Sequence, residues 1–237
     1  MQPRIDPGSE CLYLRIIYPY TITHIPSTML QNRVDPKGDL IKTTARGSWM
    51  GNRGVIHDHE QHIVRPFKLK AWLICLLDFK GRRRPVMAPD RYTELFFLDE
   101  ATAFSAGHRP CAECRRKAFN RFKQCWLEAN PNYGYSERTP IWKIDEVLHK
   151  DRINRSGMKI TFMESIDHLP AGSFILYNNE PYLVADRLLF RWTPDGYEDG
   201  VVMPGVDRVE VLTPRSVVNT FRAGYKPQMA ISVHPVR

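Results

Sequence analysis

The sequence predicts an α+β fold, with a mixed α/β N-terminal part followed by a smaller part of antiparallel strands. Two features predict it. Between residues 73 and 154, short apolar segments rich in β-formers alternate with segments whose apolar residues recur every three or four positions, as on a helix face. Beyond residue 158, short apolar segments alternate with Pro, Gly and Asn turns about every ten residues, which is typical of a small antiparallel sheet or barrel.

The chain therefore divides into three predicted parts. Residues 1–30 contain isolated apolar patches and four prolines without a sustained period, and we expect them to form a peripheral extension. Residues 31–157 carry the mixed helices and strands, and residues 158–237 form the β-rich part. A chain of 237 residues, 43% of them apolar, is long enough to bury a core in both folded parts.

Local signals predict each element in turn. Residues 73–79 and 92–98 are predicted strands because they are rich in β-branched and aromatic residues. Asp99 is a predicted N-cap for a helix that starts near Glu100 and ends at Gly107. Two further helices are expected over residues 117–130 and 144–154. The apolar stripe of the first of these consists of Phe119, Phe122, Cys125 and Trp126. The predicted C-terminal strands are residues 159–164, 173–178, 181–186, 188–193 and 208–213.

Composition also limits where the protein works. No segment approaches the roughly 18 uninterrupted apolar residues that a membrane helix needs, and the first residues lack the apolar core of a secretory signal. Five cysteines are few for this length and odd in number, which argues against a disulfide framework and favours metal or thiol chemistry. We expect a soluble, cytoplasmic protein with no membrane partner.

Cys111 and Cys114 have the C-x-x-C spacing, between the rigid Pro110 and a predicted helix. Two thiolates at this spacing can bind one tetrahedral zinc ion at about 2.3 Å. Redox pairs share the spacing but usually follow a strand that carries an aromatic residue, and two unrelated core thiols are a further alternative. We predict a zinc knuckle. A closed zinc site has four ligands, and Cys75 and His57 are the candidates for the other two.

Residues 96–119, FFLDEATAFSAGHRPCAECRRKAF, resemble the second half of the Ada-type metal-binding domain of alkyl-DNA-repair methyltransferases. The resemblance lies in an aromatic strand, a short helix ending in Ala-Gly, and the Arg-Pro-Cys-x-x-Cys motif. It implies that Cys111 and Cys114 supply two of four zinc thiolates and that the protein acts on DNA. The family carries its other two cysteines upstream, one of them the methyl acceptor, whereas the corresponding stretch here, GRRRPVMAP, has none. The resemblance therefore does not extend to methyl acceptance.

The charge balance gives a second indication of the partner. Thirty-four basic residues against 26 acidic ones give a net charge of +8, which attracts polyanions. A loop fixed by zinc presents its cations from one rigid point, close to a helix N-terminus that also favours phosphate. We predict nucleic acid, DNA rather than RNA, as the partner, with a solvated charged face as the alternative. The predicted nucleic-acid-binding residues are Arg82, Arg83, Arg84, Arg109, Arg115, Arg116 and Lys117.

Two other functions also fit the residues. The segment from His57 to His62 combines histidines with carboxylates, as a metal-dependent nuclease or hydrolase requires. The candidate catalytic residues on that hypothesis are His59, Glu60 and His149. Alternatively, zinc is purely architectural and the β-rich part binds a protein or small ligand. The positions to examine in that case are Arg187, Arg191, Trp192 and Tyr197.

Overall fold

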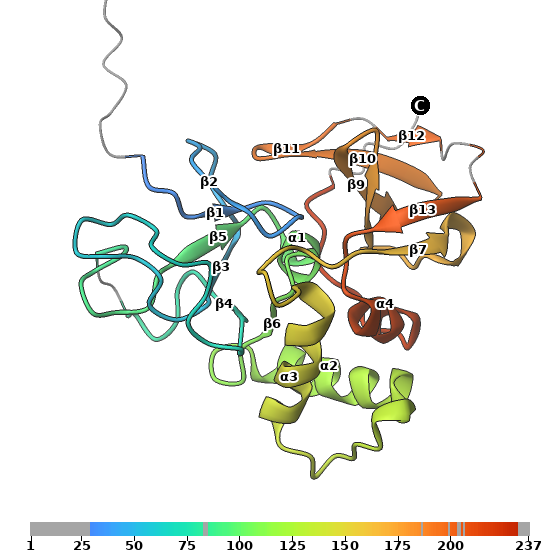
Figure 1. Ribbon diagram of the computed structural model, residues 1–237, viewed down its shortest axis with the longest axis horizontal. Helices are drawn as coiled ribbons and strands as arrows, with labels where there is room; N and C mark the ends of the chain where they lie inside the picture. Colours follow the sequence, from blue (N-terminus) through green and yellow to red (C-terminus); the bar gives the residue numbers. More distant parts are fainter. Residues whose placement is uncertain are drawn as a thin grey trace, which may run out of the picture.

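The computed structural model describes residues 29–82, 85–185, 187–198, 200–202, 205 and 207–231. These residues form four α-helices, two short 3-10 helices and two β-sheets, so the fold is α+β as predicted. In Figure 1 the two sheets lie on opposite sides of the molecule, with one helix between them and the other helices below. Residues 1–28 of the predicted N-terminal extension lie outside the described residues.

The first sheet contains the strands that position the cysteines. They are β1 (Arg33–Val34), β2 (Leu40–Ile41), β3 (Trp49–Asn52), β4 (Leu73–Cys75), β5 (Leu95–Phe97) and β6 (Arg109–Pro110). Their order is β2-β1-β5-β3-β4-β6, with β1–β5 and β4–β6 parallel and the other pairs antiparallel. The strands predicted over residues 73–79 and 92–98 are present, but shorter than expected.

Helix α1 (Glu100–Ser105) begins where the sequence predicts it. Asp99 is its N-cap, and the carboxylate accepts a hydrogen bond from the backbone N–H of Thr102 at 2.7 Å. Gly107 follows the helix with a φ of +89°, and a Cβ at this position would lie 2.4 Å from Cδ of Arg152. Because both the conformation and the close contact exclude a side chain, the chain needs glycine at this point.

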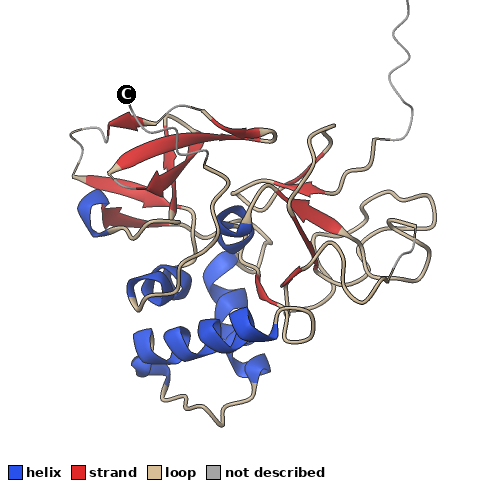
Figure 2. Cartoon of the chain, turned by 180° about the vertical axis from the view of Figure 1, so that it is seen from behind, coloured by secondary structure: helices blue, strands red, loops and turns tan. Residues whose placement is uncertain are grey.

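Helices α2 (Arg116–Ala129) and α3 (Ile141–Arg152) lie at the base of the molecule, joined through the segment that contains the 3-10 helix η1 (Pro131–Tyr133) (Figure 2). α2 buries the predicted stripe of Phe119, Phe122, Cys125 and Trp126. α3 starts earlier than predicted because Pro140, whose fixed φ suits a helix N-terminus, is its N-cap. Within the described part of the chain, no helix combines the length and apolarity needed to span a bilayer.

The second sheet is antiparallel and matches the predicted C-terminal strands. It consists of β7 (Phe162–Ser165), β8 (Phe174–Tyr177), β9 (Glu180–Ala185), β10 (Leu188–Thr193), β11 (Gly196–Tyr197), β12 (Val201–Val202) and β13 (Arg208–Val211), with the 3-10 helix η2 (Ile166–His168) after β7. Its order is β11-β10-β9-β8-β13-β7, and β12 pairs with β10. Residues such as Ile175, Val184 and Val211 pack its own apolar core.

The end of the described chain returns to the first part. Helix α4 (Arg215–Arg222), which the sequence did not lead us to expect, places Val217 and Phe221 in the same core as the first sheet and α2. Beyond it, the hydroxyl of Tyr225 donates to Glu100 of α1 at 2.7 Å. Residues after β13 therefore contact the N-terminal elements, while Val218 of α4 packs in the core of the second sheet.

Candidate metal centre

Three cysteine thiols converge at one end of the first sheet. The Sγ atoms of Cys75, Cys111 and Cys114 all lie within 4.8 Å of one another, and no other such group of metal-ligating side chains occurs among the described residues. Sulfur ligands about 2.3 Å from a tetrahedral ion are about 3.8 Å apart, so small side-chain adjustments would accommodate zinc. Cys75 and Cys111 are buried and Cys114 is half-buried. The structure thus places Cys75 beside the C-x-x-C pair, as predicted.

Strand pairing explains why these thiols meet. β4 and β6 run parallel with Ile74 opposite Pro110, so Cys75 and Cys111 follow at the same end of neighbouring strands. The backbone N–H of Cys111 also donates to the carbonyl of Ile74, at 2.9 Å. The chain then turns into α2 and carries Cys114 back toward the first two sulfurs. The parallel pairing of β4 with β6 therefore brings Cys75 next to the C-x-x-C motif, although the two are far apart in the sequence.

The surroundings stabilise negative charge on two of the sulfurs. The pKa of the Cys111 thiol is lowered to about 5, chiefly by a hydrogen bond from Cys75 and also by the backbone N–H groups of Cys114 and Glu113, against the effect of burial. The pKa of Cys114 is lowered as well, first by Cys75. Cys75 donates to both and has a raised pKa. The lowered pKa of these two thiols favours metal binding, because thiolates rather than thiols are metal ligands.

His57, the other predicted ligand, does not join this group. Its buried ring has Nδ1 2.6 Å from the hydroxyl of Thr93 and Nε2 3.3 Å from the carbonyl oxygen of Ala88. Both ring nitrogens therefore have partners within the protein, and the histidine ties its own loop to the segment before β5. Among the described residues, the group consists of three cysteines and no fourth protein ligand.

A pocket of about 690 Å³ borders the three thiols. Its other lining residues include Asn52, Phe79, Arg82, Tyr92, Glu94 and Glu113. Glu94 is 4% exposed, and its carboxylate accepts a hydrogen bond from the N–H of Met87 at 2.8 Å. Apolar surface with a few buried polar groups is typical of small-molecule pockets, so this one offers a route for a non-protein ligand to the sulfurs.

Two of the predicted nucleic-acid-binding arginines are used inside the fold. Arg109 forms a bidentate ion pair with Asp145, at 2.6 and 2.8 Å, and the two side chains are 4% and 5% exposed. Arg115 pairs with Glu100 at 2.7 Å and lies over the ring of Trp49 at 4.0 Å. Neither guanidinium group is available to a phosphate backbone, contrary to our expectation. Both instead attach the loop of residues 111–115, which we call the cysteine loop, to the helices and strands around it.

The other predicted cations lie outside the core. Arg116 and Lys117 are exposed on the first turn of α2, immediately after the cysteine loop. Arg82 is exposed and forms a 2.8 Å ion pair with Glu113, within the loop itself. Arg83 and Arg84 fall outside the described residues. Of the predicted cations that the structure describes, three are therefore exposed: Arg82, Arg116 and Lys117.

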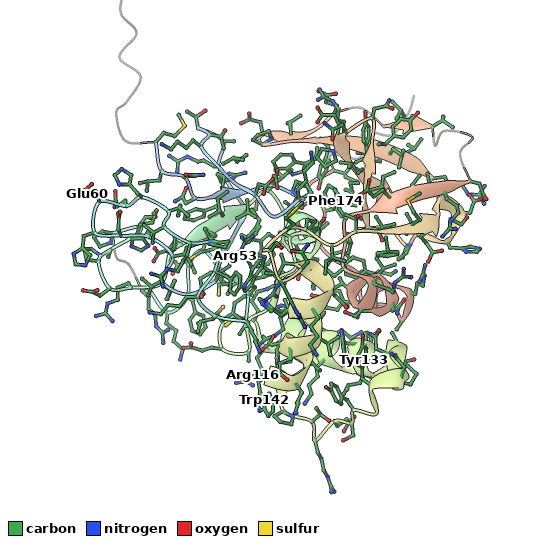
Figure 3. All side chains as sticks on the ribbon, in the orientation of Figure 1. Arg53, Glu60, Arg116, Tyr133, Trp142 and Phe174 are labelled. Carbon is green, nitrogen blue, oxygen red and sulfur yellow. The ribbon has the colours of Figure 1, made fainter. Side chains whose placement is uncertain are left out.

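The candidate catalytic residues do not form a common site in the described part of the chain. His59 and Glu60 have side chains that are 76% and 81% exposed, and Figure 3 shows Glu60 at the outer edge of the molecule. His149 belongs to α3, where its Nδ1 lies 2.8 Å from Nη2 of Arg152. Burial, together with the charges of Arg152 and Lys70, lowers the pKa of His149 to about 4, so its ring is neutral at pH 7. The described geometry gives the hydrolase hypothesis no metal group at these positions.

Three of the four positions considered in the β-rich part lie in contacts within the fold, and Arg187 is exposed. The hydroxyl of Tyr197 donates to Asp99 at 2.8 Å, which attaches β11 to the start of α1. Trp192 is 7% exposed, and Arg191 forms an ion pair with Glu198. These contacts account for the residues as parts of the fold.

The sequence did not draw attention to Arg53 and Lys159, which lie with Arg152 around a second pocket. Arg53 sits in a glycine-rich stretch and Lys159 at the edge of a predicted strand, so neither belongs to a motif or period that would have marked it. Comparison with known proteins finds no relative: no protein-family model, no curated protein and no solved structure matches the chain.

Proposed function

We propose that this is a zinc protein in which Cys75, Cys111 and Cys114 hold one ion whose fourth coordination position faces the adjoining pocket. The observation that carries the proposal is the convergence of three thiols at the wall of a 690 Å³ pocket. Soft sulfur ligands in a tetrahedral arrangement favour zinc over the harder divalent ions. The fourth position would take water or a small molecule with a thiol or imidazole donor.

An open position favours ligand binding or catalysis over a purely structural role. Structural zinc sites are closed by four protein ligands, whereas catalytic sites combine three with a water or substrate. The pocket also contains the buried carboxylate of Glu94, and a carboxylate near zinc-bound water is the usual general base of zinc hydrolases. Hydrolysis or group transfer on a small molecule is the reaction class that these groups support.

Replacement of zinc by cobalt(II) tests the open position. Cobalt–thiolate charge-transfer absorption should indicate three sulfur ligands, and added imidazole or 2-mercaptoethanol should change the visible spectrum because it enters the fourth position. Cys125→Ala is the matched control, because this buried thiol lies on α2 outside the group and its removal should leave the spectrum unchanged. Cys11→Ser should also leave it unchanged; residue 11 lies outside the described residues.

A cobalt spectrum that does not change when imidazole or 2-mercaptoethanol is added would rule out an open fourth position. If Cys11→Ser reduced the cobalt–thiolate absorption, Cys11 would be the fourth ligand and the site would be closed and structural. Either result would leave the metal in place but remove the argument for catalysis.

Nucleic-acid binding is our second candidate function, and the exposed cations after the cysteine loop favour it. Arg116 and Lys117 extend from the first turn of α2, where the helix dipole also attracts phosphate, and the chain carries a net charge of +8. The resemblance to the Ada-type domain makes DNA, and a role in its repair or processing, the first class to test. A metal-held loop would present these two residues in a fixed position.

The salt dependence of DNA affinity tests this candidate. The double variant Arg116→Gln/Lys117→Gln should flatten the dependence of log K on log salt by about two phosphate contacts, because each contact adds about 0.9 to the slope. Lys226→Gln, an exposed lysine beyond α4, is the control and should change little. Measurements with single-stranded DNA, duplex DNA and RNA would separate the substrates. A flat salt response, or equal slopes for the two variants, would reject this interface.

A further inference from the structure

A second pocket, of about 540 Å³, lies where three parts of the fold meet. Arg53, just after β3, and Trp72, just before β4, line it from the first sheet. Arg152 at the end of α3 and Lys159 before β7 also line it, and Leu176 of β8 and Leu212 just after β13 add apolar surface from the second sheet. Figure 3 shows Arg53 near the middle of the molecule rather than at its edge. Junctions of this kind are frequent sites for small ligands.

Three positively charged side chains, which we call the cationic cluster, lie together in this pocket: Arg53, Arg152 and Lys159. Arg53 and Arg152 are 2% and 1% exposed, and their guanidinium carbons lie over the Trp72 ring at 3.9 and 3.8 Å from its centre. Contact with the ring restricts the orientation of each guanidinium plane. The cluster is therefore rigid as well as charged.

Neutral groups, rather than carboxylates, hold the cationic cluster. Arg53 donates to Nε2 of His108 at 3.3 Å and to the carbonyl of Gly38 at 3.0 Å. Arg152 donates to the carbonyls of Gly107 and Lys70, at 2.8 and 2.6 Å, while its buried Nε has no hydrogen-bond partner. Lys159 donates to the carbonyl of Ser105. Such contacts fix the side chains without neutralising their charge.

The carboxylates nearby do not pair with the cationic cluster. Asp145 is taken by Arg109, and Glu210 accepts a hydrogen bond from Thr161 at 2.7 Å. Asp35 accepts one from the N–H of Asp39 at 2.9 Å, in the turn between β1 and β2. Within the described part of the chain, no member of the cationic cluster forms an ion pair.

Buried positive charges without counter-ions are unfavourable. Burial, above all, lowers the pKa of Lys159 to about 7 and that of Arg53 to about 9, although the charges of Asp35 and Asp39 oppose both shifts. Charges buried in this way normally have an opposite charge beside them, because desolvation is otherwise not offset. An anion that enters the pocket would supply the missing charge.

We propose that this pocket binds a small phosphate-bearing molecule, with the phosphate on the cationic cluster and the organic part against Trp72 and the apolar side chains of the second sheet. A phosphate has enough charge and acceptor oxygens for three cations, whereas a carboxylate saturates with one arginine. The volume of about 540 Å³ exceeds what inorganic phosphate needs and fits a phosphate monoester.

Isothermal titration of the full chain with phenyl phosphate, benzoate and inorganic phosphate tests the proposal. We expect phenyl phosphate to bind more tightly than the other two, since it alone offers both the dianion and the ring. Lys159→Met should weaken its binding by about tenfold or more, the effect of losing one charge-assisted hydrogen bond. Lys159→Arg should retain it, and Lys226→Met, at an exposed position, is the control.

The pH dependence of the affinity for phenyl phosphate is a second, independent test. The ionisable groups facing Lys159 or lining the same pocket are Lys37, Arg53, His108, Arg152, Asp35, Asp39 and Glu210. A bound phosphate favours protonated Lys159, so the affinity should fall as the pH rises above about 7, by up to about tenfold per unit. Lys159→Arg should show a much flatter profile between about pH 7 and 8.5, because arginine keeps its proton.

Three results would overturn the proposal: no binding of phenyl phosphate at millimolar concentration, equal affinity for benzoate, or binding that Lys159→Met leaves unchanged. Far-UV circular dichroism of each variant distinguishes a lost site from a lost fold. Because Lys159 is only half-buried, it is the member of the cationic cluster whose replacement tests the site with the least disturbance of the core.

Discussion

The partners of the buried arginines separate two roles at the residue scale. Arg109 and Arg115 each face a carboxylate and tie the cysteine loop to the helices. Arg53 and Arg152 face carbonyls and histidine, and neither forms an ion pair within the described part of the chain. A paired buried arginine stabilises its surroundings, whereas an unpaired one at a pocket wall is poised to bind an anion.

Removing Asp145 tests the structural role of the first kind. Asp145→Asn should lower the free energy of unfolding by about 3–5 kcal/mol, because it leaves the buried Arg109 charge without its partner. Urea denaturation followed by fluorescence measures the change. Glu113→Gln breaks the exposed pair with Arg82 and should cost no more than about 1 kcal/mol. Similar losses of the free energy of unfolding in the two variants would show that the buried ion pair contributes no more to stability than the exposed one.

At the scale of single elements, local signals located most helices and strands but not all. Asp99 as N-cap, Gly107 as terminator and the α2 stripe lie where the sequence predicted them, because each depends on neighbours a few positions away. α4 escaped prediction because its N-cap, Pro214, makes no side-chain cap and the helix has only eight residues. Packing against α2 and α3 stabilises it, and packing partners distant in sequence cannot be read from a local pattern.

Phe221 tests the contribution of α4. Its ring is 5% exposed and contacts Phe104 edge to face at 5.3 Å. Phe221→Ala should reduce the free energy of unfolding by about 3–5 kcal/mol, since it leaves a cavity between the helix and the first core. Val202→Ala, at a position 80% exposed, is the control and should change it by less than about 0.5 kcal/mol. A comparably small effect at Phe221 would mean that α4 is only loosely attached.

On the scale of the whole molecule, both pockets are made by long-range contacts. The C-x-x-C motif and Cys75 could be singled out from the sequence, since spacing and a neighbouring strand suggested them. The position of His57 could not be foreseen, because its contact with Thr93 depends on how two loops meet. The sequence could not predict the cationic cluster either, because its members are far apart in the chain: one follows β3, one ends α3 and one precedes β7.

Elemental analysis tests the three-thiol metal centre most directly. Purified full-length protein should contain one zinc ion per chain, Cys75→Ser should lose most of it, and Cys125→Ala should retain it, because Cys125 is not part of the group. Far-UV spectra of the same samples would show whether metal loss also unfolds the chain. Protein that contains no stoichiometric metal, or a Cys75→Ser variant that keeps its full complement, would contradict the metal centre.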